Sequence, residues 1–348
     1  MKAAMRYVSV ALLVLGCVAG ARAEERAESR QEEAAPQGRP RREDVEEAKD
    51  QLEIDLPDNV AVARDVIYGK GGERELKLTL FAPKYNPEVH PGIVFVHGGA
   101  WRKGSPALYF RHAVDMASKG YVCAAVEYRL SGEAAFPAAV EDVKCAVRWM
   151  RANARTYRLD PEKIAAVGNS AGGHLAAMLG VMNAEDDLEG TGGNEEQSSK
   201  VNAVVAFYGV YDFMTLGVMN PEGAFALFLG GLPEEVPEVY KRASPMTYVD
   251  GSDAPFLLLH GTADKLVPIK QSEDMRKALE DAGVRAELYV AEGGGHVFEK
   301  DPAEYDKSLA RMEEFLADVF DLAKPEEPET PDATTKATEK RPVRTQYE

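Results

Sequence analysis

Residues 163–172 read KIAAVGNSAG, a short apolar run followed by a serine between two glycines. The run Ile164 to Gly168 has the length and composition of a buried strand, and helical periodicity begins at Ala171. A serine at such a strand-to-helix turn is typical of a nucleophile elbow, in which the sharp turn exposes the hydroxyl group. Glycine neighbours allow the strand and the helix to approach closely. The stretch therefore predicts Ser170 as a nucleophile.

Outward from this turn, apolar runs alternate with segments of helical periodicity. Strand and helix in series predict a mainly parallel sheet covered on both faces, with the first two strands as an antiparallel edge. The expected strands are 63–68, 76–82, 92–97, 121–128, 164–168, 203–208, 255–260 and 286–291. The expected helices are 106–119, 137–154, 171–182, 270–282 and 303–322, the last with Leu309, Met312, Leu316 and Val319 facing inward.

A second glycine-rich turn, His97-Gly98-Gly99-Ala100-Trp101, directly follows the apolar run 92–96. Backbone N–H groups in such a loop can point at the negative charge that develops on a reacting carbonyl oxygen. We expect the N–H groups of Gly99, Ala100 and Ala171 to form this oxyanion hole. Both turns follow predicted strands, where parallel sheets place their ligand sites.

A serine hydroxyl needs a base to take its proton, and in this class of site the base is a histidine. His296 lies in a glycine-rich loop after the last predicted strand, and we expect it to be the general base. The other five histidines have simpler expected roles: His90 and His112 at surface positions, His97 in the oxyanion loop, His174 packed within a helix, and His260 at a turn.

The carboxylate that orients the histidine should follow a strand between the serine and the histidine. Folds that carry a nucleophile elbow keep the chain order serine, acid, histidine. Asp264 meets that condition. Asp250 and Asp253 precede the strand and Asp274 lies within a helix, so we expect capping or solvation from them.

These segments resemble those of α/β-hydrolase esterases near the hormone-sensitive-lipase-like group and, more closely, of the bacterial feruloyl and acetylxylan esterase-like branch. The resemblance covers about residues 60–322. Ala100 and Asn169 depart from the lipase-like pattern, which has a third glycine and an acidic residue at these places. The matching segments are 96–101, 127–130, 136–138 and 168–176, with the Asp264 and His296 loops.

The resemblance implies an α/β-hydrolase fold and a serine carboxylesterase that works through an acyl-enzyme without a cofactor or metal. The implied substrates are short-chain or aromatic acyl esters, such as acetyl or feruloyl groups on carbohydrate. Arylformamidases and prolyl-oligopeptidase-like amidases or peptidases remain alternatives on the same fold. A non-catalytic binding protein is the alternative of another class, although such a protein has no need of a complete triad.

The flanks predict an exported protein, either periplasmic or secreted. Residues 1–23 carry positive charge, an apolar run and a small-residue cleavage pattern, which is typical of a signal peptide. Cys17 offers lipidation as a second route. Residues 24–58 have the composition of a charged linker, and 323–348 that of a disordered Pro/Glu/Thr-rich tail. The hydrolase domain is expected at 59–322, with a short cap at about 209–250.

The formal net charge of −17 argues against a nucleic-acid partner, because an acidic surface repels phosphate. A small-molecule or carbohydrate-borne ester is easier to accommodate. The apolar run at 7–20 is shorter than the roughly 20 residues that span a bilayer, so no membrane span is expected. The sequence leaves the oligomeric state open, as it does a bond between Cys123 and Cys145.

Overall fold

The computed structural model describes residues 56–84, 87–183, 186–216 and 223–322. The predicted signal at 1–23, most of the linker at 24–58 and the tail at 323–348 lie outside these residues, as do residues 217–222 of the predicted cap. In the described part of the chain, no helix has the length and apolar character needed to cross a membrane.

One eight-stranded sheet has the strand order β1-β2-β4-β3-β5-β6-β7-β8. Strand β2 pairs antiparallel with β1 and β4, whereas every neighbouring pair from β4 onward is parallel. The predicted α/β-hydrolase fold, with eight strands and an antiparallel edge, is therefore confirmed. The strands are β1 Val60–Gly71, β2 Arg74–Pro83, β3 His90–Val96, β4 Val122–Val126, β5 Leu159–Asn169, β6 Ala203–Phe207, β7 Phe256–Gly261 and β8 Ala286–Ala291.

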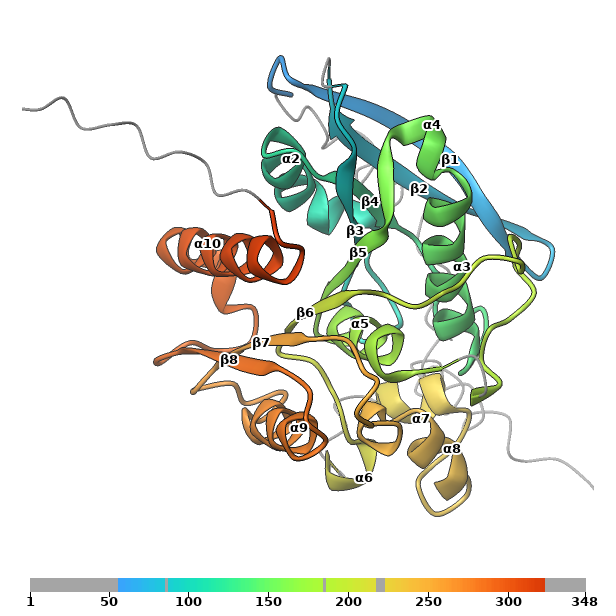
Figure 1. Ribbon diagram of the computed structural model, residues 1–348. Helices are drawn as coiled ribbons and strands as arrows, with labels where there is room; N and C mark the ends of the chain where they lie inside the picture. Colours follow the sequence, from blue (N-terminus) through green and yellow to red (C-terminus); the bar gives the residue numbers. More distant parts are fainter. Residues whose placement is uncertain (1–55, 85–86, 184–185, 217–222, 323–348) are drawn as a thin grey trace, which may run out of the picture. The chain divides into compact units, whose positions relative to one another are not determined.

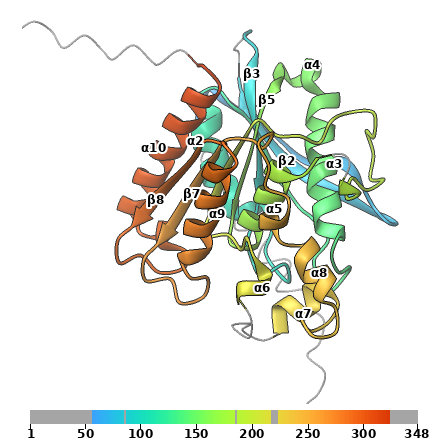
Figure 2. The same cartoon turned by 60° about the horizontal axis from the view of Figure 1, so that its bottom comes forward.

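Helices cover both faces of this sheet, with α2 and α10 on one face and α3, α5 and α9 on the other (Figure 1). The helices of the predicted cap gather at one end of α5 (Figure 2). The helical segments are η1 Pro106–Tyr109, α2 Phe110–Ser118, α3 Ala138–Ala152, α4 Ala154–Tyr157, α5 Ala171–Val181, α6 Phe213–Leu216, α7 Ala224–Leu229, α8 Pro237–Arg242, η4 Pro245–Thr247, α9 Lys270–Asp281, η5 Phe298–Lys300 and α10 Pro302–Val319.

The core lies on both faces of the central strands, and every residue of β3, β4, β6 and β7 is buried. This is expected of parallel strands sandwiched between helix layers. Helix α5 is also buried along its whole length. Its Gly172 passes so close to β3 that a Cβ atom there would lie 2.0 Å from the carbonyl oxygen of Val96. The helix that follows the nucleophile is thus fixed against the centre of the sheet.

The buried stripe predicted for α10 is partly wrong. Met312 and Leu316 are buried, but Leu309 and Val319 are only partly so. The buried face includes polar side chains that an apolar pattern ignores. The residues buried along this helix are Tyr305, Ser308, Met312, Phe315 and Leu316.

The surface positions expected for His90 and His112 are wrong, because both side chains are buried. Helix α10 packs against α2, so the ring of His112 lies 4.6 Å from the ring of Tyr305, centroid to centroid. Such a long-range contact leaves no trace in local periodicity. Cys123 and Cys145 are buried free thiols rather than a disulfide.

Candidate active site

The strand-to-helix turn after β5 holds Ser170 in a strained conformation, with φ 53° and ψ −118°. A positive φ is uncommon outside glycine and persists where the surroundings enforce it. The hydroxyl oxygen lies 3.0 Å from Nε2 of His296, which arrives from the loop after β8. Nδ1 of His296 lies 2.7 Å from Oδ2 of Asp264, in the loop after β7. The structure thus brings together the three residues that the sequence singled out.

The carboxylate of Asp264 is fixed by two backbone donors on its other oxygen. Oδ1 accepts hydrogen bonds from the N–H groups of Leu266, at 2.8 Å, and Val267, at 2.9 Å. Burial alone would raise the pKa of Asp264, but hydrogen bonds from His260, His296 and the Val267 N–H hold that pKa well below its usual range. Asp264 is therefore a carboxylate that can orient a histidine and stabilise its charged form.

A second serine and histidine pair lies behind the first. Nε2 of His260 donates to the Val267 carbonyl oxygen at 2.8 Å and also lies 3.3 Å from Oδ2 of Asp264. Nδ1 of His260 accepts from the hydroxyl of Ser272 at 2.7 Å. His260 and Ser272 are fully buried, whereas Ser170 is partly exposed. Accessibility thus favours Ser170 as the nucleophile, and His260 holds the turn as expected.

The oxyanion loop has an unusual backbone. Gly99, Ala100 and Trp101 have φ values of 122°, 54° and 57°. The Gly99 carbonyl oxygen accepts two backbone hydrogen bonds within the loop, which close it into a tight turn. Among the described residues, no hydrogen bond uses the N–H of Gly99, Ala100 or Ala171 as donor. These three N–H groups remain available for a ligand oxygen.

The side chain of Trp101 connects the oxyanion loop to α5 and to the cap, through contacts that the sequence analysis did not predict. Nε1 of Trp101 donates to Nδ1 of His174 on α5 at 3.2 Å, and Nε2 of His174 donates to the Ala243 carbonyl oxygen at 2.7 Å. Burial lowers the pKa of His174 to about 4, in keeping with a neutral ring. The Trp101 ring also stacks on Phe228 of α7 with centroids 4.5 Å apart. The predicted packing role of His174 is borne out by these contacts.

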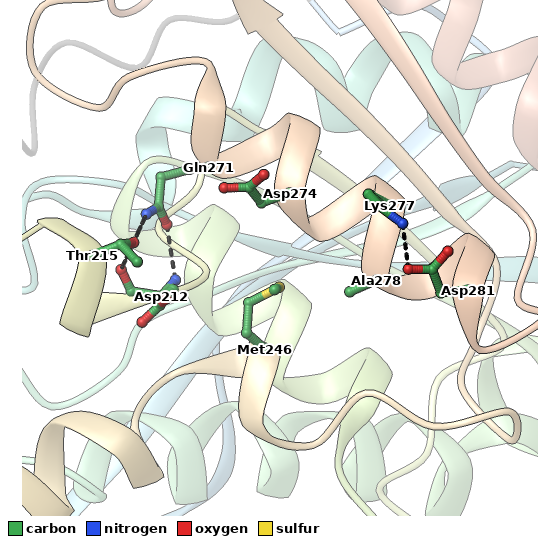
Figure 3. A pocket seen from close by; sticks show the side chains of 8 residues that line it. All are labelled: Asp212, Thr215, Met246, Gln271, Asp274, Lys277, Ala278 and Asp281. Atoms are coloured by element: carbon green, nitrogen blue, oxygen red, sulfur yellow. Dashed lines mark hydrogen bonds and ion pairs between the residues drawn. The ribbon is translucent and has the colours of Figure 1, made fainter.

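A hollow of about 260 Å³ lies between the cap and α9, and Ser170 is not among the residues that line it (Figure 3). Gln271 of α9 crosses it to accept from the Asp212 N–H at 2.8 Å and to donate to the Thr215 hydroxyl at 2.9 Å. Lys277 pairs with Asp281 on its own helix. These polar groups therefore bond to other protein groups, and the hydrogen bonds of Gln271 join α9 to the cap. No cluster of metal-binding side chains occurs among the described residues.

A model of the BD-FAE family matches residues 78–279. The esterase LipQ of Mycobacterium tuberculosis is 33% identical over 250 residues, which make up 68% of this chain and 57% of that protein. The chain spans between 53% and 57% of the length of the first three curated relatives that it matches. The family match covers both predicted turns and the candidate carboxylate.

Solved esterase structures share the architecture. The native esterase 2 of Thermogutta terrifontis is 32% identical, with a TM-score of 0.67 over 78% of this chain and 97% of that one. That esterase has also been solved phosphonylated by cyclosarin and with propionate bound. A truncated carbohydrate esterase from gut microbiota is 28% identical, with a TM-score of 0.66 over 76% of this chain and 98% of that one.

Proposed function

Because the chain belongs to the BD-FAE family of α/β-hydrolase esterases, we propose that it is a serine carboxylesterase with Ser170 as the nucleophile. The observation that carries the proposal is the position of His296, within hydrogen-bond distance of both Ser170 and Asp264. Acyl transfer by a serine requires a hydroxyl that a substrate can reach, an imidazole that takes its proton and a carboxylate that orients the imidazole. Ser170, His296 and Asp264 supply these groups in hydrogen-bonded order.

The geometry supports a two-step reaction. Nε2 of His296 takes the proton of Ser170 as the hydroxyl attacks the ester carbonyl, and then delivers that proton to the departing alcohol. Water, deprotonated by the same nitrogen, then releases the acid from the acyl-enzyme. The N–H groups of Gly99, Ala100 and Ala171 stabilise the oxyanion in both steps.

The substrate class in this proposal is a short-chain or aromatic acyl ester, carried by a carbohydrate that an exported enzyme would meet. The propionate bound by the Thermogutta terrifontis esterase supports the short acyl group. The similarity to the carbohydrate esterase from gut microbiota supports the carbohydrate. In the described part of the cap, Phe213, Phe225 and Phe228 pack around Trp101. All four rings are buried, so this part of the cap is packed with side chains, which favours a short acyl group in the proposal.

Labelling with an organophosphonate tests the nucleophile. Intact-mass analysis should show one adduct on the wild-type protein and on Ser272→Ala, but none on Ser170→Ala. The Ser272 variant is the matched control, because its hydroxyl also bonds a histidine but is fully buried. An adduct that persists in Ser170→Ala, or disappears only in Ser272→Ala, would overturn the assignment.

Substrate profiling tests the class of ester. Values of kcat/KM for acetyl and feruloyl esters, acetylated xylan included, should exceed those for esters of ten or more carbons. A preference for long chains would reject the substrate class. Greater activity on formylkynurenine or on a peptide amide than on every ester would favour the amidase alternatives, and no turnover by a protein that still reacts with phosphonate would reject the esterase.

A further inference from the structure

Asn169, the residue before the nucleophile, uses both ends of its side-chain amide. Its Oδ1 accepts from the N–H of Gly98 at 2.8 Å, and its Nδ2 donates to the hydroxyl oxygen of Tyr208 at 3.1 Å. Gly98 directly precedes the oxyanion donor Gly99. One side chain therefore joins the nucleophile turn to the oxyanion loop.

Tyr208 continues this chain of hydrogen bonds toward the histidine loop. It follows β6, has a φ of 37° and is fully buried. A bulky residue at positive φ costs about 1–3 kcal/mol, so its surroundings must hold it there. Its hydroxyl donates to Oε1 of Glu299, and its ring meets the ring of His296 edge-on, with centroids 4.5 Å apart.

Glu299 lies in η5, three residues after His296. Burial raises the pKa of this carboxyl group, and the hydrogen bond from Tyr208 acts in the opposite direction. Its second oxygen, Oε2, is buried and has no hydrogen-bond partner among the described residues. The hydroxyl of Tyr208 is thus the side-chain donor that holds this carboxylate beside the histidine loop.

We propose that Asn169, Tyr208 and Glu299 form a positioning relay that keeps the oxyanion loop, the nucleophile turn and the histidine loop in register. The proposal rests on the function proposed above. The relay runs in one direction, from the Gly98 N–H through the amide and the hydroxyl to the carboxylate. Tyr208 contacts the ring of His296 and Asn169 directly precedes Ser170, so the relay acts on turnover through these two residues.

The direction of the relay explains why an amide stands at position 169. An aspartate there could still accept from Gly98, but it has no N–H to offer Tyr208. The introduced carboxylate and that of Glu299 would then compete for the single hydroxyl proton, so two carboxylates would face one donor. A carboxamide is the side chain of this shape that accepts on one side and donates on the other.

Turnover in four variants tests the relay. Tyr208→Phe and Asn169→Asp should each lower kcat by about 10²-fold, the scale of a misplaced catalytic group, with KM nearly unchanged. Glu299→Leu should fall by a similar factor. Glu299→Gln should retain most of the activity, because its amide oxygen can still accept from the Tyr208 hydroxyl.

Tyr289→Phe is the matched control, because it removes a tyrosine and glutamate hydrogen bond of 2.9 Å between β8 and α10 and keeps the ring that stacks on Phe298. Its kcat should equal that of the wild type. The rate of Ser170 phosphonylation, measured in every variant, should follow the order of the kcat values. This rate requires no ester turnover, so it tests the relay even if the wild type fails on every ester and the proposed function is rejected.

Three results would overturn the relay. The first is a folded Tyr208→Phe protein with wild-type kcat and wild-type phosphonylation rate. The second is a rise in KM at constant kcat, which would assign these residues to substrate binding. The third is equal loss of activity in Glu299→Gln and Glu299→Leu in proportion to a lowered Tm, which would mean a structural role only.

Discussion

Replacing Asp264 by asparagine keeps the shape of the side chain and removes its charge. In the structure, the N–H groups of Leu266 and Val267 both point at Oδ1. The amide oxygen of an asparagine must take that place, which puts its NH₂ group against Nδ1 of His296. That nitrogen would then have to accept, its proton would move to Nε2, and Nε2 could no longer take the proton of Ser170.

The size of the loss follows from two competing arrangements. The wrong tautomer costs about 10⁴-fold in kcat in the related protease triad, which corresponds to about 5 kcal/mol. Rotating the amide would restore the tautomer but leave the part-buried N–H of Leu266 and the buried N–H of Val267 facing an NH₂ group, at about 1–3 kcal/mol each. The loss in kcat should therefore be near 10⁴-fold and no smaller than the roughly 30-fold that 2 kcal/mol represents.

Steady-state kinetics on an aryl acetate measure this loss, with circular dichroism to establish that the variant is folded. Asp274→Asn is the control, since its exposed pair with Lys270 is worth about 0–1 kcal/mol and it lies outside the site. A folded Asp264→Asn protein whose kcat falls less than about 30-fold would refute the reasoning. The orienting role would then belong to another carboxylate.

Two further substitutions test the oxyanion loop and the buried histidines. Gly99→Ala should lower kcat for aryl acetates by about 10²-fold, because a Cβ at this φ of 122° would lie 2.0 Å from a carbonyl oxygen of the same loop, and unchanged kcat would contradict the loop's role. Burial, with a smaller effect of Arg111, lowers the pKa of His112 to about 4, so the unfolded state binds more protons between pH 4 and 6.5 and the free energy of unfolding falls as the pH falls through this window. His112→Phe should make that decline shallower by up to about 3 kcal/mol in urea unfolding at pH 7 and 4.5, and an equally steep decline would exclude this histidine as a cause.

The sheet and the three central side chains could be predicted because their signals are local. A glycine turn after an apolar run marks Ser170, and the order of loops along the chain selects Asp264 and His296. The carboxyl ends of parallel strands lie at the same end of the sheet, so these loops are expected to meet there even when the contacts between them are not known.

The remaining contacts could not be predicted, because they join distant segments through side chains that suit several roles. Glu299 reads as a solvated residue beside Lys300, and only the fold places it under Tyr208. His112 sits in a helix whose outer face is hidden by α10, from the far end of the chain. The departure at Asn169 was visible in the sequence, but its meaning depended on the two partners that the fold supplies.

Under the proposed function, the contact between Trp101 and Phe228 constrains how this protein can diversify. The tryptophan belongs to the loop whose N–H groups would stabilise the oxyanion of the transition state, and the phenylalanine belongs to the cap that would select the acyl group. A substitution of Phe228 that widens the site for a new acyl group also removes the ring that packs against Trp101 of that loop. Variants selected for altered specificity should therefore lose speed on every substrate until a second change repacks the tryptophan, and adaptation through this cap should require paired substitutions.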